Sequence, residues 1–512
     1  MPRYAAIDIG SNSVRMLAAE ATPTGIRSLA ADRSVTRLGE SVFRSGRISE
    51  DAIRFLCEQL ARMRDVYVKL EVLGVRAVAT AAVRDASNQH ELLERATEAA
   101  GTPVEIISGQ EEARLIHLGV QSRWPHKNKR ILIVDVGGGS VELVLSEDGE
   151  LKAAFSKPLG AVRLTEVFLK SDPPDERALA RLEKYVDEKL AAPLSRIGPG
   201  PFDRLIATSA TAAAIVCAIN RVPRARRDSA DRLRATAAQV RKLSKELNVR
   251  DLAARRKYAG IGPRRAEIIV AGAAVFRRVL DTFQQPSLYY LAAGVRDGII
   301  ADLAARGVGR ELSQLSREQR AVVEEMARRY GVSLRHARRV AVLAHELFEG
   351  LRQLHRLPAE QGKLLEAAAY LHDIGHFVSD TGHHKHSSYI VSHADMPGFT
   401  DAERHIVAML CRYHRKTMPQ ARHSAYQTLA SEWKRSIIYM APLLRLADSL
   451  DRGHEQRVED VECQFKNGTV VLTLKAHADA DLEQWAAEGA GDVFRQVYQT
   501  PLTVVRVRAG LQ

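Results

Sequence analysis

Two segments of the sequence share a pattern that suits phosphate and metal chemistry. Residues 6–17 and 133–143 each run from an apolar stretch through an aspartate, Asp8 or Asp135, into a turn of glycine and serine and then into a second apolar stretch. Glycine lets the turn backbone approach a ligand closely, so that its N–H groups point at phosphate oxygens. A carboxylate at a strand end can hold a divalent cation or its water shell. Two such hairpins predict two related half-domains that close on a phosphate.

The same hairpins supply candidate ligands. We expect Mg²⁺ to be bound through oxygen by Asp135 and Glu142, with Asp8 as a further candidate. Cleavage of a phosphoanhydride needs an in-line water and neutralisation of charge. We expect the terminal phosphate to lie on the backbone N–H groups of the two turns, at Ser11, Asn12, Ser13, Gly137, Gly138, Gly139 and Ser140.

Positive charge is concentrated in one window. Residues 221–265 hold fifteen Lys/Arg and four Asp/Glu, in a chain whose net charge is +13. The window predicts a basic surface that attracts a polyanion, with a solvated helical face as the alternative. Its single aromatic residue, Tyr258, argues against nucleic acid, because base-stacking proteins interleave several aromatic side chains. A ligand rich in phosphate and poor in bases fits better.

The elements that must position these residues fall into three regimes. Strand-like and helical runs alternate over residues 1–300, helical runs follow one another from 301 to 455, and strands return from 456. Alternation predicts α/β layers. We therefore expect two α/β domains at 1–128 and 129–300, an all-α domain at 301–455 and a small α+β domain at 456–512.

Individual elements follow from the same patterns. Strands are expected at 4–9, 73–79, 104–108, 131–136, 141–146, 205–208, 287–291, 458–465, 470–474 and 502–507. Helices are expected at 50–68, 89–100, 111–120, 175–190 and 482–497. Residues 466–469 have the composition of a hairpin turn.

Composition excludes several classes of protein. The chain has 512 residues, of which 46% are hydrophobic and 27% charged, which excludes a mostly disordered, collagen-like or disulfide-scaffold chain. Its four cysteines are far apart and form no Cys-x-x-Cys pair, so we expect reduced thiols rather than a zinc cluster. We find no signal-peptide pattern and no apolar run long enough to span a bilayer. We expect a cytoplasmic protein without a membrane partner.

Further motifs carry a family resemblance. Residues 106–115 read Ile-Ile-Ser-Gly-Gln-Glu-Glu-Ala-Arg-Leu, residues 79–84 read Ala-Thr-Ala-Ala-Val-Arg, and residues 294–298 read Gly-Val-Arg-Asp-Gly. Together with the two hairpins, they resemble the exopolyphosphatase and guanosine pentaphosphate phosphohydrolase (Ppx/GppA) family, within the actin, Hsp70 and sugar-kinase superfold. Residues 208–211 read Thr-Ser-Ala-Thr where the family has Thr-Ser-Gly-Thr. Ala210 would set that loop slightly further from its ligand.

The resemblance implies two ribonuclease H-like domains of that superfold and assigns roles to residues. Glu112 would be the general base that positions or deprotonates water, while Glu111, one residue away on a helix, would face elsewhere. Arg84 would offer a bidentate fork to phosphate oxygens, and Ser209 and Thr211 would bind phosphate. Taken alone, Glu112 would be an ordinary carboxylate at a helix start, and Arg84 a surface arginine.

The helical region carries a second constellation. His336, the pair His372 and Asp373, and Asp448 occur in this order, which resembles the HD phosphohydrolase domain, and His414 is a further candidate ligand. Imidazole and carboxylate ligands suit a divalent transition metal or Mg²⁺. The resemblance implies an HD-type site for a second divalent metal. Two basic stretches, 383–386 and 412–416, would supply further ligands, line a channel for polyphosphate, or form an exposed cationic edge.

These features predict an exopolyphosphatase that releases terminal orthophosphate from inorganic polyphosphate by Mg²⁺-assisted hydrolysis. The first alternative is a guanosine pentaphosphate (pppGpp) 5′-phosphohydrolase, which shares the N-terminal chemistry; the basic window and the lack of a clear guanine pocket favour polyphosphate. A non-hydrolytic polyphosphate or alarmone sensor is a third possibility, opposed by the presence of Glu112, Asp135 and Glu142. An ATP-using sugar kinase is opposed by the motif at 106–115. The family resemblance also implies a homodimer.

Overall fold

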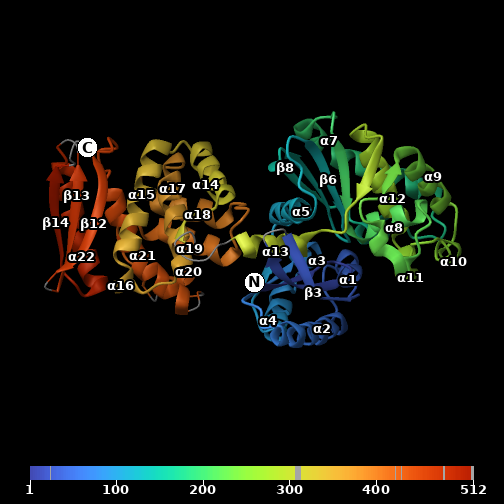
Figure 1. Ribbon diagram of the computed structural model, residues 1–512, viewed down its shortest axis with the longest axis horizontal. Helices are drawn as coiled ribbons and strands as arrows, with labels where there is room; N and C mark the ends of the chain where they lie inside the picture. The colour runs from blue at the N-terminus through green and yellow to red at the C-terminus, as the bar shows by residue number, and fades with distance from the viewer. Residues whose placement is uncertain are drawn as a thin grey trace. The chain divides into compact units, whose positions relative to one another are not determined.

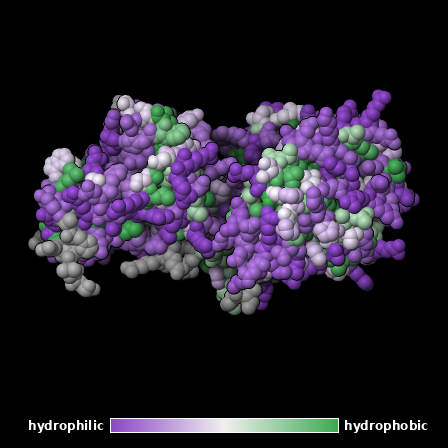
Figure 2. All heavy atoms as spheres, turned by 90° about the horizontal axis from the view of Figure 1, so that it is seen from above, coloured by the Kyte–Doolittle hydropathy of each residue, from purple (hydrophilic) through white to green (hydrophobic). Residues whose placement is uncertain are grey.

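Two compact units make up the chain, residues Met1–Ala305 and Arg306–Gln512. The computed structural model describes residues 1–22, 25–305, 313–420, 423–427, 429, 431–466, 468–476 and 479–508 (Figure 1). The face drawn in Figure 2 is mostly hydrophilic, with apolar side chains in small separate groups. Across the described ranges, none of the helices combines the length and the apolar character that a membrane span needs.

The first unit contains two mixed sheets that repeat one strand order. The first sheet has the order β3-β2-β1-β4-β5, and the second has the order β10-β11-β9-β6-β7-β8. Apart from β10, each is an antiparallel meander of three strands followed by two parallel strands. The strands are β1 (Arg3–Ile9), β2 (Val14–Thr22), β3 (Gly25–Ser34), β4 (Gly74–Ala79), β5 (Val104–Ile106), β6 (Arg130–Val136), β7 (Val141–Glu147), β8 (Glu150–Lys157), β9 (Arg204–Thr208), β10 (Arg234–Thr236) and β11 (Ser287–Tyr290).

Helices bury both faces of each sheet. Alternate residues of β6 show this, because Leu132 and Val134 pack in a different cluster from Ile131 and Ile133. The helices are α1 (Leu38–Ser45), α2 (Glu50–Lys69), α3 (Ala81–Asp85), α4 (Gln89–Ala100), α5 (Gly109–Arg123), α6 (Ala161–Phe168), α7 (Glu176–Ile197), α8 (Ser209–Ile219), η1 (Arg224–Ala230), α9 (Ala237–Asn248), α10 (Leu252–Arg255), α11 (Pro263–Ala266), α12 (Ile269–Thr282) and α13 (Val295–Ala305).

Helix α5 lies between the two sheets and is held there by close contact with α13. Leu115 of α5 packs in the cluster of the first sheet, whereas Ile116 packs in a cluster of the second. A Cβ atom at Gly298 would lie 1.8 Å from the carbonyl oxygen of Leu115, and one at Gly119 would lie 2.4 Å from that of Gly294. Any larger residue would force the helices apart. The glycines around α13 therefore fix the position of the helix that carries Glu112.

The second unit is a set of helices that shares one core with a small sheet. Buried apolar residues from Leu315 to Val504 form a single cluster. This core continues across residue 455, where a boundary between the all-α domain and the small α+β domain was predicted. The division of the chain into four domains stays a prediction. The helices are α14 (Arg317–Arg329), α15 (Leu334–Gly350), α16 (Arg352–His355), η3 (Ala359–Gln361), α17 (Gly362–Leu371), η4 (Ile374–Phe377), α18 (His383–His393), α19 (Asp401–Tyr413), α20 (Ser424–Gln427), α21 (Ser431–Ser449) and α22 (Asp481–Tyr498).

The C-terminal sheet has the order β12-β13-β14, with strands β12 (Val458–Lys466), β13 (Thr469–Ala476) and β14 (Leu502–Arg508). β12 and β13 are antiparallel, and β13 and β14 are parallel, with α22 as the connection. The three predicted strands and the predicted helix are confirmed. Lys466 pairs with Thr469, as the predicted turn at 466–469 requires, although Asn467 itself lies outside the described residues.

Three strands of the first unit escaped the sequence prediction. They are β3, β8 and β10, and each lies at the edge of its sheet. No residue of β3 or β8 is buried. Edge strands tolerate charged and polar side chains, so they lack the apolar pattern on which the prediction depended. The four cysteines are free thiols in the structure, as expected.

Candidate active site

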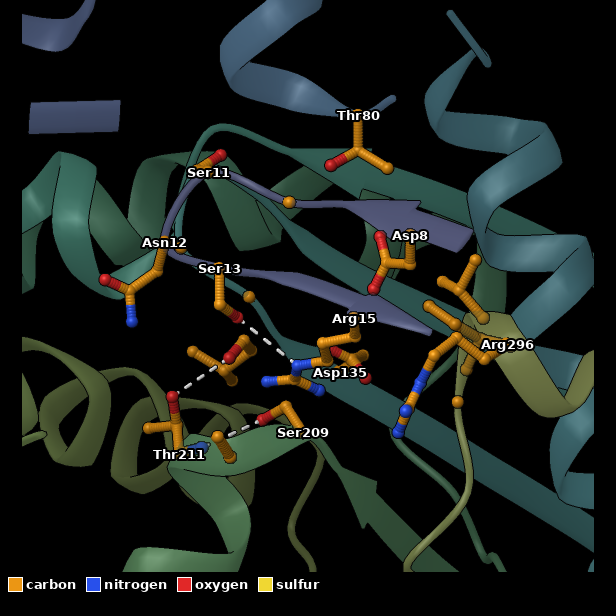
Figure 3. Close-up of a pocket in the computed structure, with 18 of the residues that line it drawn as sticks. Asp8, Ser11, Asn12, Ser13, Arg15, Thr80, Asp135, Ser209, Thr211 and Arg296 are labelled. Atoms are coloured by element: carbon orange, nitrogen blue, oxygen red, sulfur yellow. Dashed lines mark hydrogen bonds between the residues drawn. The ribbon is translucent and has the colours of Figure 1, made fainter. Parts of the chain in front are cut away.

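A cavity of about 450 Å³ lies in the first unit, where the ends of β1 and β6 meet (Figure 3). Its wall includes the turn after β1, the turn after β6, the start of α8, Tyr290 and residues 292–297. All seven residues predicted to cradle phosphate line it: Ser11, Asn12, Ser13, Gly137, Gly138, Gly139 and Ser140. The sequence pattern therefore located two distant turns that the fold brings to one cavity.

Both turns are closed by the same hydrogen bond and pack against each other. Gly10 N–H donates to the carbonyl of Ser13 (3.1 Å), and Gly137 N–H donates to that of Ser140 (3.0 Å). A Cβ atom at Gly139 would lie 2.6 Å from Ser11 Oγ. Glycine is thus needed there for contact between the two turns, in addition to access for a ligand.

The start of α8 forms another part of the wall, with Ser209, Ala210 and Thr211. Ser209 has φ +84°, and its Oγ accepts hydrogen bonds from the N–H groups of Thr211 (3.2 Å) and Ala212 (3.4 Å). Left-handed backbone at a residue other than glycine is costly and typical of functional sites. Ala210 has no positive φ, so alanine replaces the family glycine without backbone strain, and it still lines the cavity.

Four carboxyl groups gather beside the cavity, at Asp8, Glu112, Asp135 and Glu142. Asp135 faces Glu142 across the β6–β7 pair and Thr208 across the β6–β9 pair. Thr208 Oγ1 donates to Asp135, and Ser156 Oγ donates to Glu142 (2.8 Å). Asp8, Glu112 and Asp135 line the cavity, whereas Glu142 is buried behind the lining residues. The predicted ligands therefore come together, with Glu142 one layer deeper.

Burial raises the pKa of each of these carboxyl groups. It raises the pKa of Asp135 to about 6 and, together with the charge of Asp135, that of Glu142 to about 8. The pKa of Glu112 lies well above its usual value because of burial first and the charge of Glu142 second. Glu112 Oε2 is buried and has no hydrogen-bond partner in the described structure. Clustered carboxylates that destabilise one another fit a hard divalent cation.

The carboxylates do not by themselves enclose a cation. Within the residues that the structure describes, no three of them bring oxygens within 4.8 Å of one another. Mg²⁺ commonly takes one or two protein carboxylates and completes its shell with water and substrate phosphates. This donor set fits that kind of site, with Asp135 and Glu142 as the residues that would hold the ion.

Glu111 and Glu112 face different parts of the unit. Ser108 caps α5, and Gly109 allows the helix start to approach β8, where a Cβ atom would lie 2.3 Å from that of Ser156. Glu111 forms buried ion pairs with Arg76 (3.2 Å) and Arg114 (2.7 Å). Glu112 faces the cavity. One glutamate anchors the helix while its neighbour is available for chemistry.

Arg84 does not line the cavity. Its guanidinium donates to the carbonyl of Ile107 and lies 3.9 Å from Glu112 Oε2. The adjacent carboxylate, Asp85, pairs with Arg163. Arg84 therefore lies beside the predicted base, Glu112, and behind the cavity wall. It was expected to bind phosphate at that wall.

The cavity wall also contains five arginines that were not predicted from the sequence to belong to the site. Figure 3 shows the guanidinium groups of Arg15 and Arg296 between Asp8 and Ser209. Burial first, and repulsion among these arginines second, lower the pKa of Arg33 and of Arg265 to about 9. In the described part of the chain, none of the five forms an ion pair within 4.0 Å. They are Arg15, Arg33, Arg227, Arg265 and Arg296.

A second cavity of about 620 Å³ adjoins the first, and the two share Asn12, Arg33, Ala210, Arg227 and Arg265. Its wall adds two further arginines and apolar side chains, namely Arg224, Arg264, Val35, Phe55 and Pro263. Arg224, Arg227, Arg264 and Arg265 all come from the basic window 221–265. Part of that window therefore lines a continuous arginine-rich space. The window was the sequence signal for these residues, whereas Arg15, Arg33 and Arg296 lie outside it.

The second unit brings the histidines and aspartates predicted there together in one His/Asp cluster. His336 and His372 each lie within 3.5 Å of Asp448, measured from Nε2 to Oδ1, and His414 Nε2 lies 3.9 Å from Asp373 Oδ1. Two residues outside the predicted set join them, His376 and His383. His383 belongs to the stretch 383–386, and the structure favours a ligand role for it over an exposed edge. His376 stands three residues after Asp373, which is the signal that could have found it.

Comparison with known proteins identifies similar chains. Residues 17–306 match the Ppx/GppA phosphatase family, and residues 318–486 match Ppx/GppA phosphatase, domain III. Two curated relatives carry the name guanosine-5′-triphosphate,3′-diphosphate pyrophosphatase. The one from Vibrio vulnificus is 27% identical over 416 residues, 81% of each chain. The one from Vibrio parahaemolyticus is 26% identical over 480 residues, 93% of this chain and 92% of the relative.

Solved structures resemble part of the chain. A Ppx/GppA family member from Aquifex aeolicus is 29% identical, with a TM-score of 0.53, over 60% of this chain and 98% of that one. A structure described as an exopolyphosphatase from Cytophaga hutchinsonii is 25% identical, with a TM-score of 0.54, over 59% of this chain and 97% of that one.

Proposed function

This chain belongs to the Ppx/GppA phosphatase family and is a phosphoanhydride hydrolase, and from this premise we propose that it removes the terminal 5′-phosphate of guanosine pentaphosphate. The observation that carries the proposal is the pair of adjoining cavities that share three arginines, Arg33, Arg227 and Arg265. Guanosine pentaphosphate has phosphate chains on both sides of one nucleoside. A ligand of that form matches two joined cationic spaces, and the curated relatives carry the corresponding name.

In this proposal the first cavity holds the 5′-triphosphate. The N–H groups of the two turns bind the terminal phosphate, and Arg15, Arg265 and Arg296 offset its charge. The adjoining cavity takes the 3′-diphosphate on Arg224 and Arg264, and Phe55 offers an apolar surface to the nucleoside. This arrangement uses arginines that have no ion-pair partner in the described structure as the source of affinity.

Glu112 would act as the general base. Its carboxylate takes a proton from a water molecule, the water oxygen bonds to the terminal phosphorus, and the bond to the bridging oxygen breaks so that the leaving phosphate keeps the electron pair. A carboxylate with a raised pKa is a better proton acceptor than an ordinary glutamate. A divalent cation such as Mg²⁺, when bound, supplies further neutralisation of the phosphate charge.

Exopolyphosphatase activity is the second candidate. The sequence motifs and the basic window predicted it, and the arginine-rich lining from that window and the similarity to the Cytophaga hutchinsonii structure support it. The relatives named for guanosine pentaphosphate favour the first candidate more strongly. Because the chain is a hydrolase, a non-hydrolytic sensor is no longer an alternative.

Other expectations also stay proposals. The repeated strand order of the two sheets supports assignment of the first unit to the actin and Hsp70 superfold. The four-domain division, the HD-type character of the helical region, a homodimeric state and a cytoplasmic location are predictions from the sequence.

The test compares substrates with purified full-length protein. We expect kcat/KM for phosphate release to be at least about tenfold higher for guanosine pentaphosphate than for GTP, which lacks the 3′-diphosphate, and higher than for long polyphosphate. Arg224→Ala should lower the value for guanosine pentaphosphate and leave that for GTP unchanged. Arg226→Ala is the matched control, because Arg226 is exposed and lines neither cavity. Faster release from polyphosphate would favour the second candidate instead.

A further inference from the structure

The carbonyl groups of the glycine turn after β6, at residues 137–139, all accept hydrogen bonds from the start of α6, at residues 160–163. One of these bonds comes from a side chain, because the Nε–H of Arg163 donates to Gly139 O (2.8 Å). The others come from backbone N–H groups: Ala161 to Gly137 O (3.0 Å), Val162 and Arg163 to Gly138 O (2.9 and 3.1 Å), and Gly160 to Gly139 O (3.3 Å).

The N–H group that follows each of these carbonyls points the opposite way, because C=O and N–H are antiparallel across a planar trans peptide. The three N–H groups belong to Gly138, Gly139 and Ser140, all of which line the first cavity. Across the described residues, these N–H groups meet no protein acceptor. With the carbonyls held at α6, three donors are thus free for a phosphate in the cavity.

The turn after β1 is held in the same way by the start of α1. Ser11 O accepts a hydrogen bond from Gly39 N–H (2.7 Å), and Asn12 O accepts one from Arg37 N–H (3.3 Å). Figure 3 shows this turn, with Ser11, Asn12 and Ser13, beside the cavity. Helix α1 begins four residues after the end of β3, and α6 begins four residues after the end of β8. The same strand-to-helix connection therefore holds both turns.

Glycine allows each helix start to approach its turn. A Cβ atom at Gly160 would lie 2.3 Å from the carbonyl carbon and oxygen of Gly138, and one at Gly39 would lie 3.1 Å from Ser11 O. Because packed atoms cannot approach to 2.3 Å, any larger residue at position 160 would displace the turn.

Arg163 adds contacts with the other half of the first unit. Its guanidinium lies 4.0 Å from the ring centroid of Phe43 in α1 and forms an ion pair with Asp85 at the end of α3. The side chain of Arg163 is 21% exposed and does not line the cavity. It can therefore act on a ligand in the cavity only through the peptide that it holds.

We propose that Arg163 is a positioning residue, which holds the Gly139–Ser140 peptide with its N–H toward the terminal phosphate of the substrate. The inference rests on the proposed function, in which this phosphate lies on the two turns. Glycine adopts several backbone conformations at little cost, so a glycine peptide that must donate to an anion needs its carbonyl held on the other side. Charge develops on the phosphate oxygens during hydrolysis, and a donor fixed beforehand stabilises it without reorganisation.

The experiment measures kcat, KM and the inhibition constant of orthophosphate, which would occupy the place of the terminal phosphate, with full-length protein. We expect Arg163→Ala to lower kcat/KM by about 10–100-fold, mainly through kcat, and to raise the inhibition constant by about 3–10-fold. Arg44→Ala is the matched control, because Arg44 pairs with Glu166 (2.9 Å) and so joins the same two helices, α1 and α6, without donating to either turn in the described structure. It should stay within about threefold of wild type.

Two further variants separate the peptide from the ion pair. Arg163→Lys keeps a cation for Asp85 but has a methylene group in place of Nε–H, so it should lose nearly as much activity as Arg163→Ala. Asp85→Asn keeps the bond from Nε–H to Gly139 and an acceptor for the guanidinium, and it should stay within about threefold of wild type. Wild-type kcat/KM and orthophosphate inhibition in Arg163→Ala or Arg163→Lys would overturn the proposal. So would an equal loss in Asp85→Asn, because the ion pair would then carry the effect.

A failure of the proposed function would appear elsewhere, in wild type, as faster phosphate release from polyphosphate than from guanosine pentaphosphate. The ratio of kcat/KM between Arg163→Ala and wild type should be the same on both substrates, because each presents a terminal phosphate to the same turn. The two failures are therefore distinguishable.

Discussion

The first cavity of the first unit, called the cleft below, and the His/Asp cluster of the second unit bind charge in two contrasting ways. The cleft is lined by carboxylates and arginines, carried on strand ends and glycine turns. The cluster consists of imidazoles and carboxylates on helices and helix ends around one core. Oxygen ligands suit Mg²⁺, whereas imidazole suits transition metals. The two regions therefore differ in the ion that each would prefer.

They also differ in how complete the ligand set is. The described carboxylates of the cleft bring no three ligand atoms within 4.8 Å of one another, whereas the cluster contains two such groups. A cation in the cleft would need substrate phosphate to complete its shell, but ions in the cluster would not. We therefore expect catalysis to depend on the cleft, and tightly retained metal to depend on the cluster.

The largest effect is expected from Glu112→Gln. Loss of the base should lower the turnover rate for phosphate release by about 10²–10⁴-fold, with substrate binding largely kept. Its neighbour provides the contrast. Glu111→Gln removes one partner of buried ion pairs and should lower stability while retaining most of the turnover of the protein that stays folded. Steady-state kinetics and thermal unfolding of both variants check this. Near-normal turnover in Glu112→Gln would contradict the assignment of Glu112 as the general base.

A smaller effect is expected from Arg265→Ala. Arg265 lines both cavities and donates a hydrogen bond to Thr211 Oγ1 (3.2 Å). Loss of a charged contact to substrate should lower kcat/KM by about 10–100-fold, from the roughly 1.5–3 kcal/mol of such a hydrogen bond. The slope of activity against salt should also become shallower, because one fewer cation competes with the counterions of the substrate. If Arg265→Ala behaves like Arg226→Ala, the arginines that line the two cavities do not bind substrate.

The scaffold of the second unit should show its own pH dependence, through Glu346. Burial raises the pKa of this carboxyl to about 7; Asp460 raises it too, while Arg339 and the N–H of Val461 (3.1 Å) act in the opposite direction. The folded protein thus holds this proton more tightly than the unfolded chain. That stability is fully present below about pH 4.5 and is lost as pH rises through 7.

We expect the Glu346→Gln variant to lose less stability than wild type between pH 5 and pH 8, by on the order of 1–3 kcal/mol. Urea unfolding at the two pH values, followed by a signal from the second unit, measures the difference. Identical losses in both proteins would show that Glu346 titrates normally. A smaller loss of stability in Glu346→Gln would show how much of the pH dependence comes from the scaffold of the second unit. The remainder could then be assigned to the cleft and the His/Asp cluster.

The smallest effect on activity is expected from His372→Ala combined with Asp373→Ala. These residues belong to the cluster, and Glu112 lies in the other unit. Phosphate release from short substrates should therefore stay within about threefold of wild type, while bound transition metal is lost. Abolished release on every substrate, in a double variant whose circular dichroism is unchanged, would place catalysis in the cluster and break the comparison.

Local patterns in the sequence were enough to locate much of both regions. Short apolar runs predicted the central strands, and two Asp and glycine turns predicted the phosphate cradle, because backbone geometry at a turn depends mainly on adjacent residues. The motif around Glu112 and the order of His336, His372, Asp373 and Asp448 likewise appear directly in the chain. These features survive in the structure at the positions that the sequence indicated.

Other features were decided by packing alone. Arg15 meets Arg265 and Arg296 at one cavity although it lies far from both in the sequence, and no local pattern marks an arginine that will line a cavity without an ion-pair partner. Arg84 faces Glu112, Glu142 lies behind the cavity wall, and His376 and His383 join the cluster only because helices cross there. The sequence by itself therefore determined the fold class, the turns and the candidate base. Tertiary packing decided which distant charges share a site, because side chains on separate elements meet according to how those elements pack.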